Sequence, residues 1–199
     1  MSIHRVTVYA ASSQALSQDY ISAASRLGRT LGEAGLSIVY GGGGRGLMGA
    51  MAEAALATGT DVHGVIPEFL TEIELGHQQL TTLRIVDTMH TRKALMLENS
   101  HAVIALPGGC GTFEELFEAM TLKRLGRFLG PIILINSGGY YNRLLEFLEH
   151  SVEERFMNQA HLQMWQSVDE PEEVLEALTS APTWSADALT HAPVLQSAP

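Results

Sequence analysis

The feature that most constrains this chain is a glycine-rich junction, PGGCGTFEE at Pro107–Glu115. The run before it, AVIAL at 102–106, is typical of a strand buried on both faces. The apolar residues after it recur at helical spacing, at Phe113, Leu116, Phe117 and Met120. Three closely spaced glycines let a ligand approach the backbone, and a helix beginning near Thr112 offers unpaired N–H groups and the positive end of its dipole. The junction is therefore predicted to bind an anion such as a phosphate.

The same residues have a second interpretation, as a capping box. The spacing Thr112-x-x-Glu115 would place Thr112 at the N-cap, with Glu115 reaching back to the N-cap amide. On this interpretation Glu115 stabilises the helix start and takes no part in chemistry. The glycines are less ambiguous, because one of them would suffice for a turn. Taken alone, the motif leaves catalysis and capping open for Glu115.

Length and composition indicate one globular domain. A chain of 199 residues with 46% hydrophobic and 17% charged residues can bury a full core. Its formal net charge of -10 argues against a nucleic-acid polymer as partner and leaves a single nucleotide open. We expect a nucleotide-binding α/β domain over residues 1–179 and a flexible tail, rich in Ala, Pro, Thr and Ser, over 180–199.

The single cysteine points to a reducing compartment. Cys110 cannot form an internal disulfide, and no Cys/His spacing is typical of zinc, so we expect no metal site and a cytoplasmic protein. At a helix start Cys110 could be a nucleophile, although no His-containing signature supports that role. No basic-then-apolar leader opens the chain, and no apolar run approaches the ~18 residues that span a bilayer. We therefore expect a soluble protein without a membrane partner.

Strand-like and helix-like runs alternate along the chain. The expected strands are 5–10, 36–40, 61–66, 80–86 near a sheet edge, 101–106, 131–136 and 164–168; the expected helices are 18–34, 47–58, 87–98, 112–125, 138–154 and 171–178. Gly35 is expected to end the first helix, and 68–79 to form a surface loop with a partial helix. The alternation predicts a doubly wound, mostly parallel sheet with helices on both faces.

A second glycine loop, GGGGRGLMG at 41–49, follows the second expected strand. As a dinucleotide motif it is weak, because it does not follow the first strand and Glu68 is the only acidic residue near the end of the next one. The alternative is a turn that packs a helix against the sheet. Ligands of doubly wound sheets bind beyond the carboxyl ends of the strands. We therefore expect Ser12, the loop 41–46 with Gly42 and Gly43, and residues 108–112 to face one crevice.

Two cations lie on an otherwise apolar helical stripe. Helical spacing places Arg92 and Lys93 beside Met89 and Met96. Their charged ends could lie in water while their stems cover apolar surface. Alternatively, they point into a cleft, where a guanidinium can hold phosphate or ribose oxygens with two hydrogen bonds.

Two of these motifs resemble those of a known family. Residues 107–115 fit the pattern PGGxGTxxE, and Met89–Lys93 fits MHxRK. Together they resemble the signature of the LOG ("lonely guy") cytokinin-activating phosphoribohydrolases, a family often mislabelled as lysine decarboxylases. The similarity extends through 41–49, Val65–Pro67 and Gly139–Tyr141, and so covers roughly residues 5–178.

The resemblance implies a Rossmann-like fold, usually dimeric, and hydrolysis of the N-glycosidic bond of (N6-modified) AMP to free base and ribose 5-phosphate. Arg92 and Glu115 would be catalytic, and no cofactor would be required. The nucleotide site would be lined by Met89, Lys93, Gly108, Gly109, Gly111 and Thr112. Two departures occur, Ala10-Ala11-Ser12 where the family commonly has Cys-Gly-Ser, and TLKRLG at 121–126 where it commonly has TWxQLG. The second bears on base selectivity and on the dimer contact.

The chemistry assigned by this resemblance suits a carboxylate. Cleavage of a ribosidic bond builds positive charge on the sugar, which Glu115 would stabilise while it orients the attacking water. Three alternatives remain: a carrier that binds AMP-like nucleotides without turnover, a general nucleoside monophosphate salvage hydrolase, and a decarboxylase with pyridoxal phosphate. The last needs a lysine Schiff base, for which Lys93 and Lys123 are the only candidates.

Overall fold

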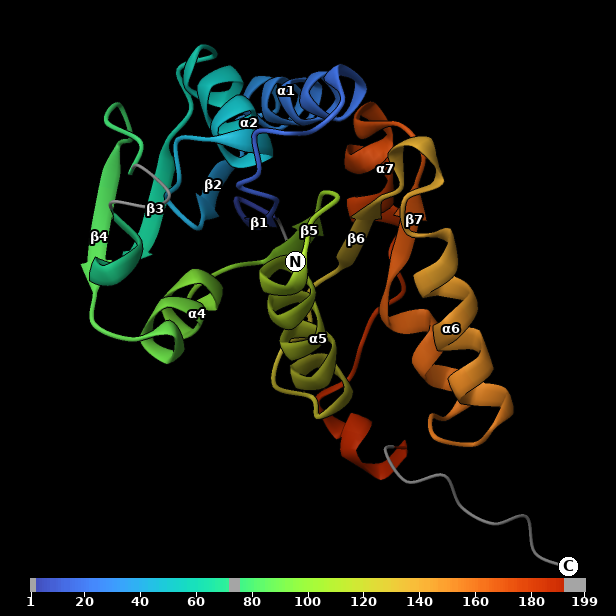
Figure 1. Ribbon diagram of the computed structural model, residues 1–199. Coiled ribbons are helices and arrows are strands. Elements are labelled where there is room, and N and C mark those ends of the chain that lie inside the picture. The colour runs from blue at the N-terminus through green and yellow to red at the C-terminus, as the bar shows by residue number, and fades with distance from the viewer. Residues whose placement is uncertain (1–2, 72–75, 192–199) are drawn as a thin grey trace, which may run out of the picture.

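The computed structural model describes residues 3–71 and 76–191, and its centre is a seven-stranded sheet (Figure 1). Every paired strand is parallel to its neighbours, in the order β4-β3-β2-β1-β5-β6-β7. The strands are β1 (Arg5–Tyr9), β2 (Ser37–Tyr40), β3 (Val62–Pro67), β4 (Thr82–Val86), β5 (Ala102–Ala105), β6 (Ile132–Ile135) and β7 (Gln166–Val168). The predicted parallel sheet is confirmed.

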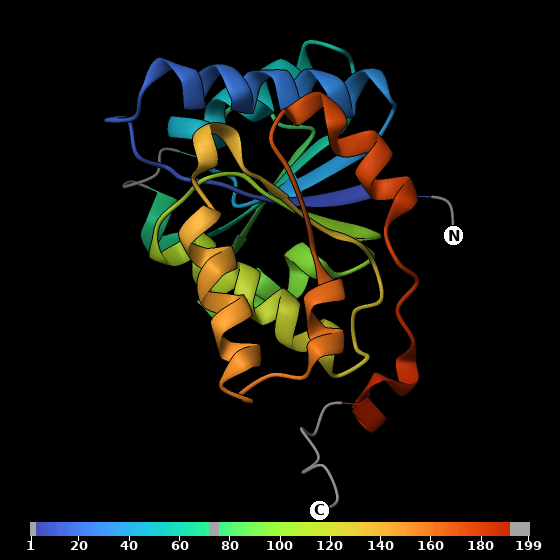
Figure 2. The ribbon, with the colours of Figure 1, turned by 90° about the vertical axis from the view of Figure 1, so that its right-hand side faces the viewer.

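Helices cover both faces of this sheet, as Figures 1 and 2 show. One layer contains α1 (Gln18–Glu33), α2 (Gly46–Leu56) and α7 (Val174–Ser180), and the other contains α4 (Met89–Leu97), α5 (Cys110–Arg124) and α6 (Asn142–Glu153). Short 3-10 helices are η1 (Glu68–Leu70), η2 (Ser137–Gly139), η3 (Gln159–Met164), η4 (Pro171–Glu173) and η5 (Ala186–His191). The fold is therefore the predicted doubly wound, Rossmann-like one.

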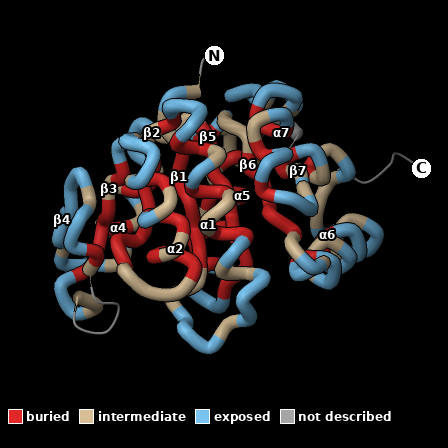
Figure 3. Tube along the Cα trace, turned by 90° about the horizontal axis from the view of Figure 1, so that it is seen from above, coloured by how far each residue is buried: buried red, intermediate tan, exposed pale blue. Residues whose placement is uncertain are grey.

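Burial follows the apolar pattern of the strands (Figure 3). Every residue of β5 and β6 is buried, as a strand covered by helices on both faces requires. Most of β4 is exposed, which confirms its predicted place at the sheet edge. None of the helices formed by the described residues combines the length and the apolar character that crossing a membrane requires.

Local sequence signals set several element ends. Gly35 follows the C-cap of α1 with a φ of 70°, and Leu36 N–H donates to the Leu31 carbonyl, so Gly35 ends the helix as predicted. Pro171 opens η4, which leads into α7. In the loop 68–79, η1 is the partial helix that was predicted, while residues 72–75 lie outside the described residues.

The chain after α7 packs more than its composition suggested. Trp184 Nε1 donates to the Lys123 carbonyl over 2.6 Å, and Ala188 is buried. Segment η5 lies beside the C-terminal end of α5, where the backbone of Gly126 approaches Ala186 closely (Figure 1). The expectation of little packing after residue 180 is therefore wrong up to Ala188, because Trp184 anchors an otherwise polar segment to α5. Residues 192–199 lie outside the described part of the chain.

The sheet order places a crevice at its centre. Strand β1 pairs with β2 on one side and with β5 on the other, so the chain reverses its winding direction between them. The loops after β1 and β5 lead to helices on opposite faces, and a space opens beyond the strand ends at such a switch point.

Candidate active site

A cavity of about 280 Å³ lies at this switch point. Its walls come from the end of β1, the loop after β2, and the starts of α2, α4 and α5. The lining residues are Val8, Tyr9, Ala10, Ala11, Ser12, Ser13, Gly41, Met48, Met89, Arg92, Gly109, Cys110, Gly111, Thr112 and Glu115. Of the predicted site residues, the structure thus brings Ser12, Met89, Arg92, Gly109, Gly111, Thr112 and Glu115 to one place.

The start of α5 forms one wall of the cavity. The helix begins at Cys110 with Gly109 as its N-cap, and glycine has no side chain with which to cap the first turn. The amides of Cys110, Gly111 and Thr112 belong to the first helical turn, where N–H groups have no partner within the helix. Gly108 must be glycine, because a Cβ there would lie 2.1 Å from Thr112 Oγ1. An anion at this wall would meet backbone N–H groups and the positive end of the helix dipole.

The capping-box interpretation of Glu115 is wrong. Because the N-cap is Gly109 and not Thr112, Glu115 lies in the second helical turn, beyond the reach of the N-cap amide. Its side chain is one of the cavity walls and is only 7% exposed. The Glu115 carboxylate therefore faces the space in which a ligand would bind.

Arg92 reaches the same cavity from α4. It is 5% exposed, which rules out for Arg92 the alternative of a charged end in bulk water. Its Nη2 donates to the Gly41 carbonyl over 3.1 Å, and Nη1 lies 3.9 Å from Met89 Sδ. A Cβ on Gly41 would lie 2.0 Å from Nη2, so the glycine loop after β2 makes room for the guanidinium.

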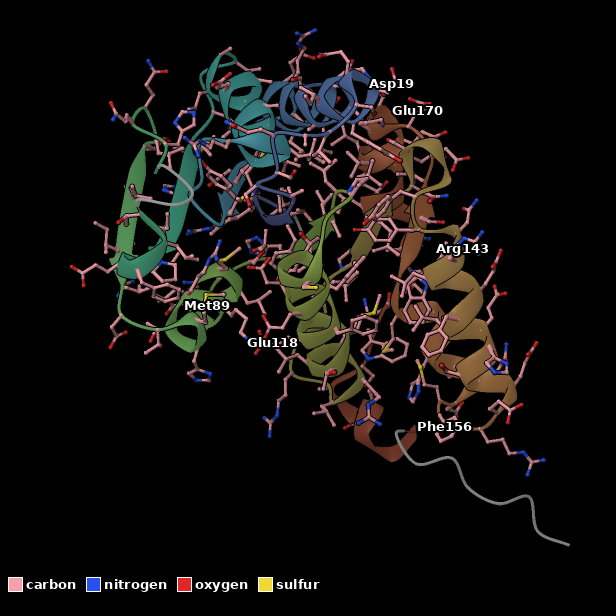
Figure 4. The ribbon with its side chains drawn as sticks, viewed as in Figure 1. Asp19, Met89, Glu118, Arg143, Phe156 and Glu170 are labelled. Carbon is pink, nitrogen blue, oxygen red and sulfur yellow. The ribbon has the colours of Figure 1, made fainter. Side chains whose placement is uncertain are left out.

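Lys93 points elsewhere. Its Nζ contacts the carboxylates of Glu114 and Glu118 on α5, the latter over 3.5 Å. The hydrogen bond to Glu114 raises the pKa of Lys93, so the ammonium stays charged. In Figure 4, Glu118 lies on the side of the sheet that carries α4 and Met89. In this structure Lys93 ties α4 to α5 and does not line the cavity.

Three predicted glycines also lie outside the cavity lining. The Gly42 carbonyl accepts from the His77 amide, and Gly42 has a φ of 79° that favours glycine. The Gly43 carbonyl accepts from the Tyr40 hydroxyl over 3.1 Å. Gly108 directs its carbonyl toward the Tyr140 hydroxyl. These glycines shape the loops around the cavity.

Several lining residues, among them Tyr9 and Met48, were not predicted as site residues. Tyr9 could have been found from strand alternation. Thr7 donates its hydroxyl to the Met96 carbonyl of α4, and Tyr9, two residues on, faces the same side. Burial raises the pKa of Tyr9 well above its usual range, and the nearby Glu115 carboxylate raises this pKa further, so the phenol keeps its proton.

The cavity offers little support for metal or lysine chemistry. Among residues 3–71 and 76–191, no three His, Cys, Asp or Glu side chains gather closely enough to hold a metal ion. Both lysines of the chain are described, and neither lines the cavity. Lys123 is buried on α5, where it donates to the Gly130 carbonyl over 2.6 Å.

Comparison with solved structures identifies the fold of this chain but not its activity. A molybdenum cofactor binding protein from Rippkaea orientalis superposes with a TM-score of 0.68 at 21% identity, over 90% of this chain and 98% of that one. The molybdenum cofactor carrier protein of Chlamydomonas reinhardtii gives a TM-score of 0.67 at 16% identity, over 90% of this chain and 98% of that one.

Sequence comparisons are more specific. Residues 48–178 match the model of a family described as "Possible lysine decarboxylase". The cytokinin riboside 5'-monophosphate phosphoribohydrolase of Rhodococcoides fascians is 46% identical over 156 residues, 78% of this chain and 79% of that protein. The enzyme of the same name from Arabidopsis thaliana, LOG3, is 44% identical over 77% of this chain and 72% of its own length. The chain therefore belongs to the family whose curated members are the cytokinin riboside 5'-monophosphate phosphoribohydrolases.

Proposed function

We propose that this protein hydrolyses the N-glycosidic bond of N6-modified adenosine 5'-monophosphate to the free base and ribose 5-phosphate, and so activates cytokinin nucleotides. The observation that carries the proposal is the position of Arg92 and Glu115. The two side chains come from separate helices, are both buried, and line one cavity together with the first turn of α5.

The start of α5 suits the 5'-phosphate. Gly109, Cys110 and Gly111 line the cavity at the N-terminus of α5, which is the positive end of the helix dipole. The hydroxyls of Ser12 and Thr112 are further donors on the same walls. For Gly42, Gly43, Gly108 and Lys93, which lie outside the lining, a direct contact with the nucleotide stays a prediction.

Glu115 suits the sugar. As the bond between C1′ and the base nitrogen breaks, its electron pair leaves with the base and positive charge develops on the ribose. A fixed carboxylate near C1′ stabilises that charge and orients a water molecule, whose oxygen bonds to C1′ while its proton passes to the carboxylate and from there, through solvent, to the nitrogen of the departed base. Arg92, held at the Gly41 carbonyl, supplies positive charge for ribose or phosphate oxygens.

Assembly and location extend the proposal. We expect a homodimer, as the family resemblance implies, and a cytoplasmic protein, because its one cysteine cannot form an internal disulfide. Its partner is a small nucleotide, since a net charge of -10 disfavours a nucleic-acid polymer.

One substrate panel tests the proposal. Purified protein is incubated with AMP, N6-modified AMP and the other nucleoside monophosphates, and free base and ribose 5-phosphate are quantified by chromatography. Release of adenine-type base, fastest from N6-modified AMP, is expected. Equal turnover of every base would favour a general salvage hydrolase, and absence of release from the whole panel would refute hydrolysis.

A second candidate is a carrier that binds AMP-like nucleotides without turnover. It is favoured by Ala10 and Ala11, which line the cavity where the family commonly has Cys-Gly. Binding of AMP in calorimetry without release of base would support it. The decarboxylase alternative is disfavoured, because neither Lys93 nor Lys123 lies in the cavity wall where a Schiff base would have to form.

A further inference from the structure

The loop between β5 and α5 is held by three successive carbonyl groups. The Leu106 carbonyl accepts from the Tyr141 hydroxyl over 2.7 Å, and the Gly108 carbonyl accepts from the Tyr140 hydroxyl over 2.6 Å. Between them, the Pro107 carbonyl accepts from the Ala11 amide over 3.3 Å. Each donor lies outside the loop, either just before α6 or in the turn after β1.

The orientation of a peptide group follows from its carbonyl. In a planar trans peptide the C=O and the N–H of the next residue point in opposite directions. When Tyr140 draws the Gly108 carbonyl toward itself, the Gly109 N–H is turned the opposite way. Gly109 lines the cavity, whereas Gly108 does not.

The peptide between Gly108 and Gly109 needs such a restraint. Neither residue has a side chain, so rotation of this peptide meets little steric resistance. A rotated peptide would present a carbonyl oxygen to an anion at the start of α5, where the native orientation presents an N–H. One hydroxyl can therefore decide whether this wall attracts or repels a phosphate.

Tyr140 is itself held in place. Its ring packs edge-to-face against Tyr141 at a centroid distance of 5.1 Å and against Tyr20 of α1 at 6.0 Å. The two preceding glycines, Gly138 and Gly139, have φ values of 63° and 71°, a conformation that favours glycine. Burial raises the pKa of Tyr140, and the neighbouring Tyr20 raises it further, so the phenol remains a hydrogen-bond donor at neutral pH.

We infer that Tyr140 is a positioning residue for the phosphate: its hydroxyl fixes the Gly108–Gly109 peptide so that the Gly109 N–H faces the bound nucleotide. This inference rests on the proposed function, because it assigns the 5'-phosphate to the start of α5. Tyr140 need not touch the substrate, since it acts through the backbone of the loop.

The neighbouring tyrosines provide matched controls. Tyr141 bonds to the Leu106 carbonyl, whose peptide ends at Pro107, and proline has no N–H to direct toward a ligand. Tyr141→Phe therefore removes an equally short hydrogen bond to the same loop without releasing an amide. Tyr20→Phe removes a hydroxyl from the ring that packs edge-to-face against Tyr140, but it leaves the hydrogen bond from Tyr140 to the Gly108 carbonyl in place.

The test combines calorimetric binding of ribose 5-phosphate with steady-state kinetics on N6-modified AMP. Tyr140→Phe keeps the ring and is expected to weaken ribose 5-phosphate binding about tenfold, the size of one hydrogen bond to a charged group. KM should rise by a similar factor and kcat should change less than about twofold, since a positioning role affects binding of the phosphate in ground and transition states alike. Tyr141→Phe should lower the melting temperature and leave binding near that of the unmodified protein.

Two results would overturn the inference. One is unchanged binding and KM in Tyr140→Phe; the other is an equal loss of binding in Tyr20→Phe or Tyr141→Phe. Failure of the proposed function is distinct, because the unmodified protein would then release no base from any nucleotide. If the unmodified protein is active and Tyr140→Phe behaves like it, only the positioning role of Tyr140 is lost.

Discussion

Replacing Glu115 with glutamine separates its chemistry from its structural role. Glutamine has nearly the same volume and helix propensity as glutamate but cannot carry a negative charge or accept a proton from water. Glu115 lies in the second turn of α5, faces the cavity and does not cap the helix. The substitution should therefore remove transition-state stabilisation and leave the fold in place.

The expected loss of kcat in Glu115→Gln follows from the proposed role of Glu115 as a general base. General acid–base groups contribute about 10²- to 10⁴-fold to rate, so kcat should fall by that factor, or by about 2.7–5.4 kcal/mol of activation free energy. The melting temperature should move by less than about 4 °C, which corresponds to about 1 kcal/mol in a chain of this size. Single-turnover release of base with saturating protein measures the chemical step, and scanning calorimetry measures stability.

The adjacent carboxylate is the matched control. Glu114 lies on the same helix but pairs with Lys93 outside the cavity. Glu114→Gln should keep kcat within about twofold, because exposed ion pairs contribute little and no cavity group changes. The reasoning is refuted if Glu115→Gln retains full activity per folded molecule, or if both variants lose activity equally.

Two further predictions concern the glycine loop and the buried lysine. Gly41→Ala removes no functional group, but its Cβ would lie 2.0 Å from Arg92 Nη2 and would displace the guanidinium, so kcat/KM should fall at least about tenfold. Steady-state kinetics measure this fall and a melting curve checks the fold; an unchanged kcat/KM would contradict the prediction. Burial lowers the pKa of Lys123 to about 8, so the folded state binds fewer protons than the unfolded state from pH ~8 to ~10.5 and its stability rises with pH there. Between pH 7 and 10 the free energy of unfolding, measured with urea, should rise by about 2–3 kcal/mol more in the unmodified protein than in Lys123→Met. If the free energy of unfolding has the same pH dependence in both proteins, the argument is wrong.

The fold could be predicted from sequence because its signals are local. The run 102–106 is apolar at every position, and the strand at 82–86 carries polar side chains where the sheet has its edge. The alternation of strands and helices then determines the parallel architecture and the location of the ligand crevice. Arg92 and Glu115 could be proposed because they belong to motifs with a known family resemblance.

What could not be predicted depends on contacts between distant segments. Thr112 has the chemistry of an N-cap, yet the N-cap of α5 is Gly109, three residues earlier, and it follows the Pro107 and Gly108 carbonyls that accept from Ala11 and Tyr140. Adjacent cations on one stripe diverge, because Gly41 leaves space for Arg92 whereas Glu114 and Glu118 attract Lys93. Neither outcome is visible in the spacing of the motif, since the deciding partners are up to 51 residues away.

The spacing within Pro107–Glu115 now has a geometric explanation. Gly109 is the N-cap of α5, the next three amides belong to the first helical turn, where a bound phosphate would meet them, and Glu115 follows Thr112 by three residues, or about 4.5 Å along the helix axis. Because helical side chains tilt toward the N-terminus, the carboxylate leans back toward the phosphate end, where the sugar of a nucleotide would lie. Glu114 is rotated by about 100° from Glu115 and faces Lys93 instead. The backbone at the start of α5 can therefore hold the phosphate while Glu115, one turn further along, presents its carboxylate to C1′. This arrangement explains why the glycines of the loop precede the glutamate by about one helical turn.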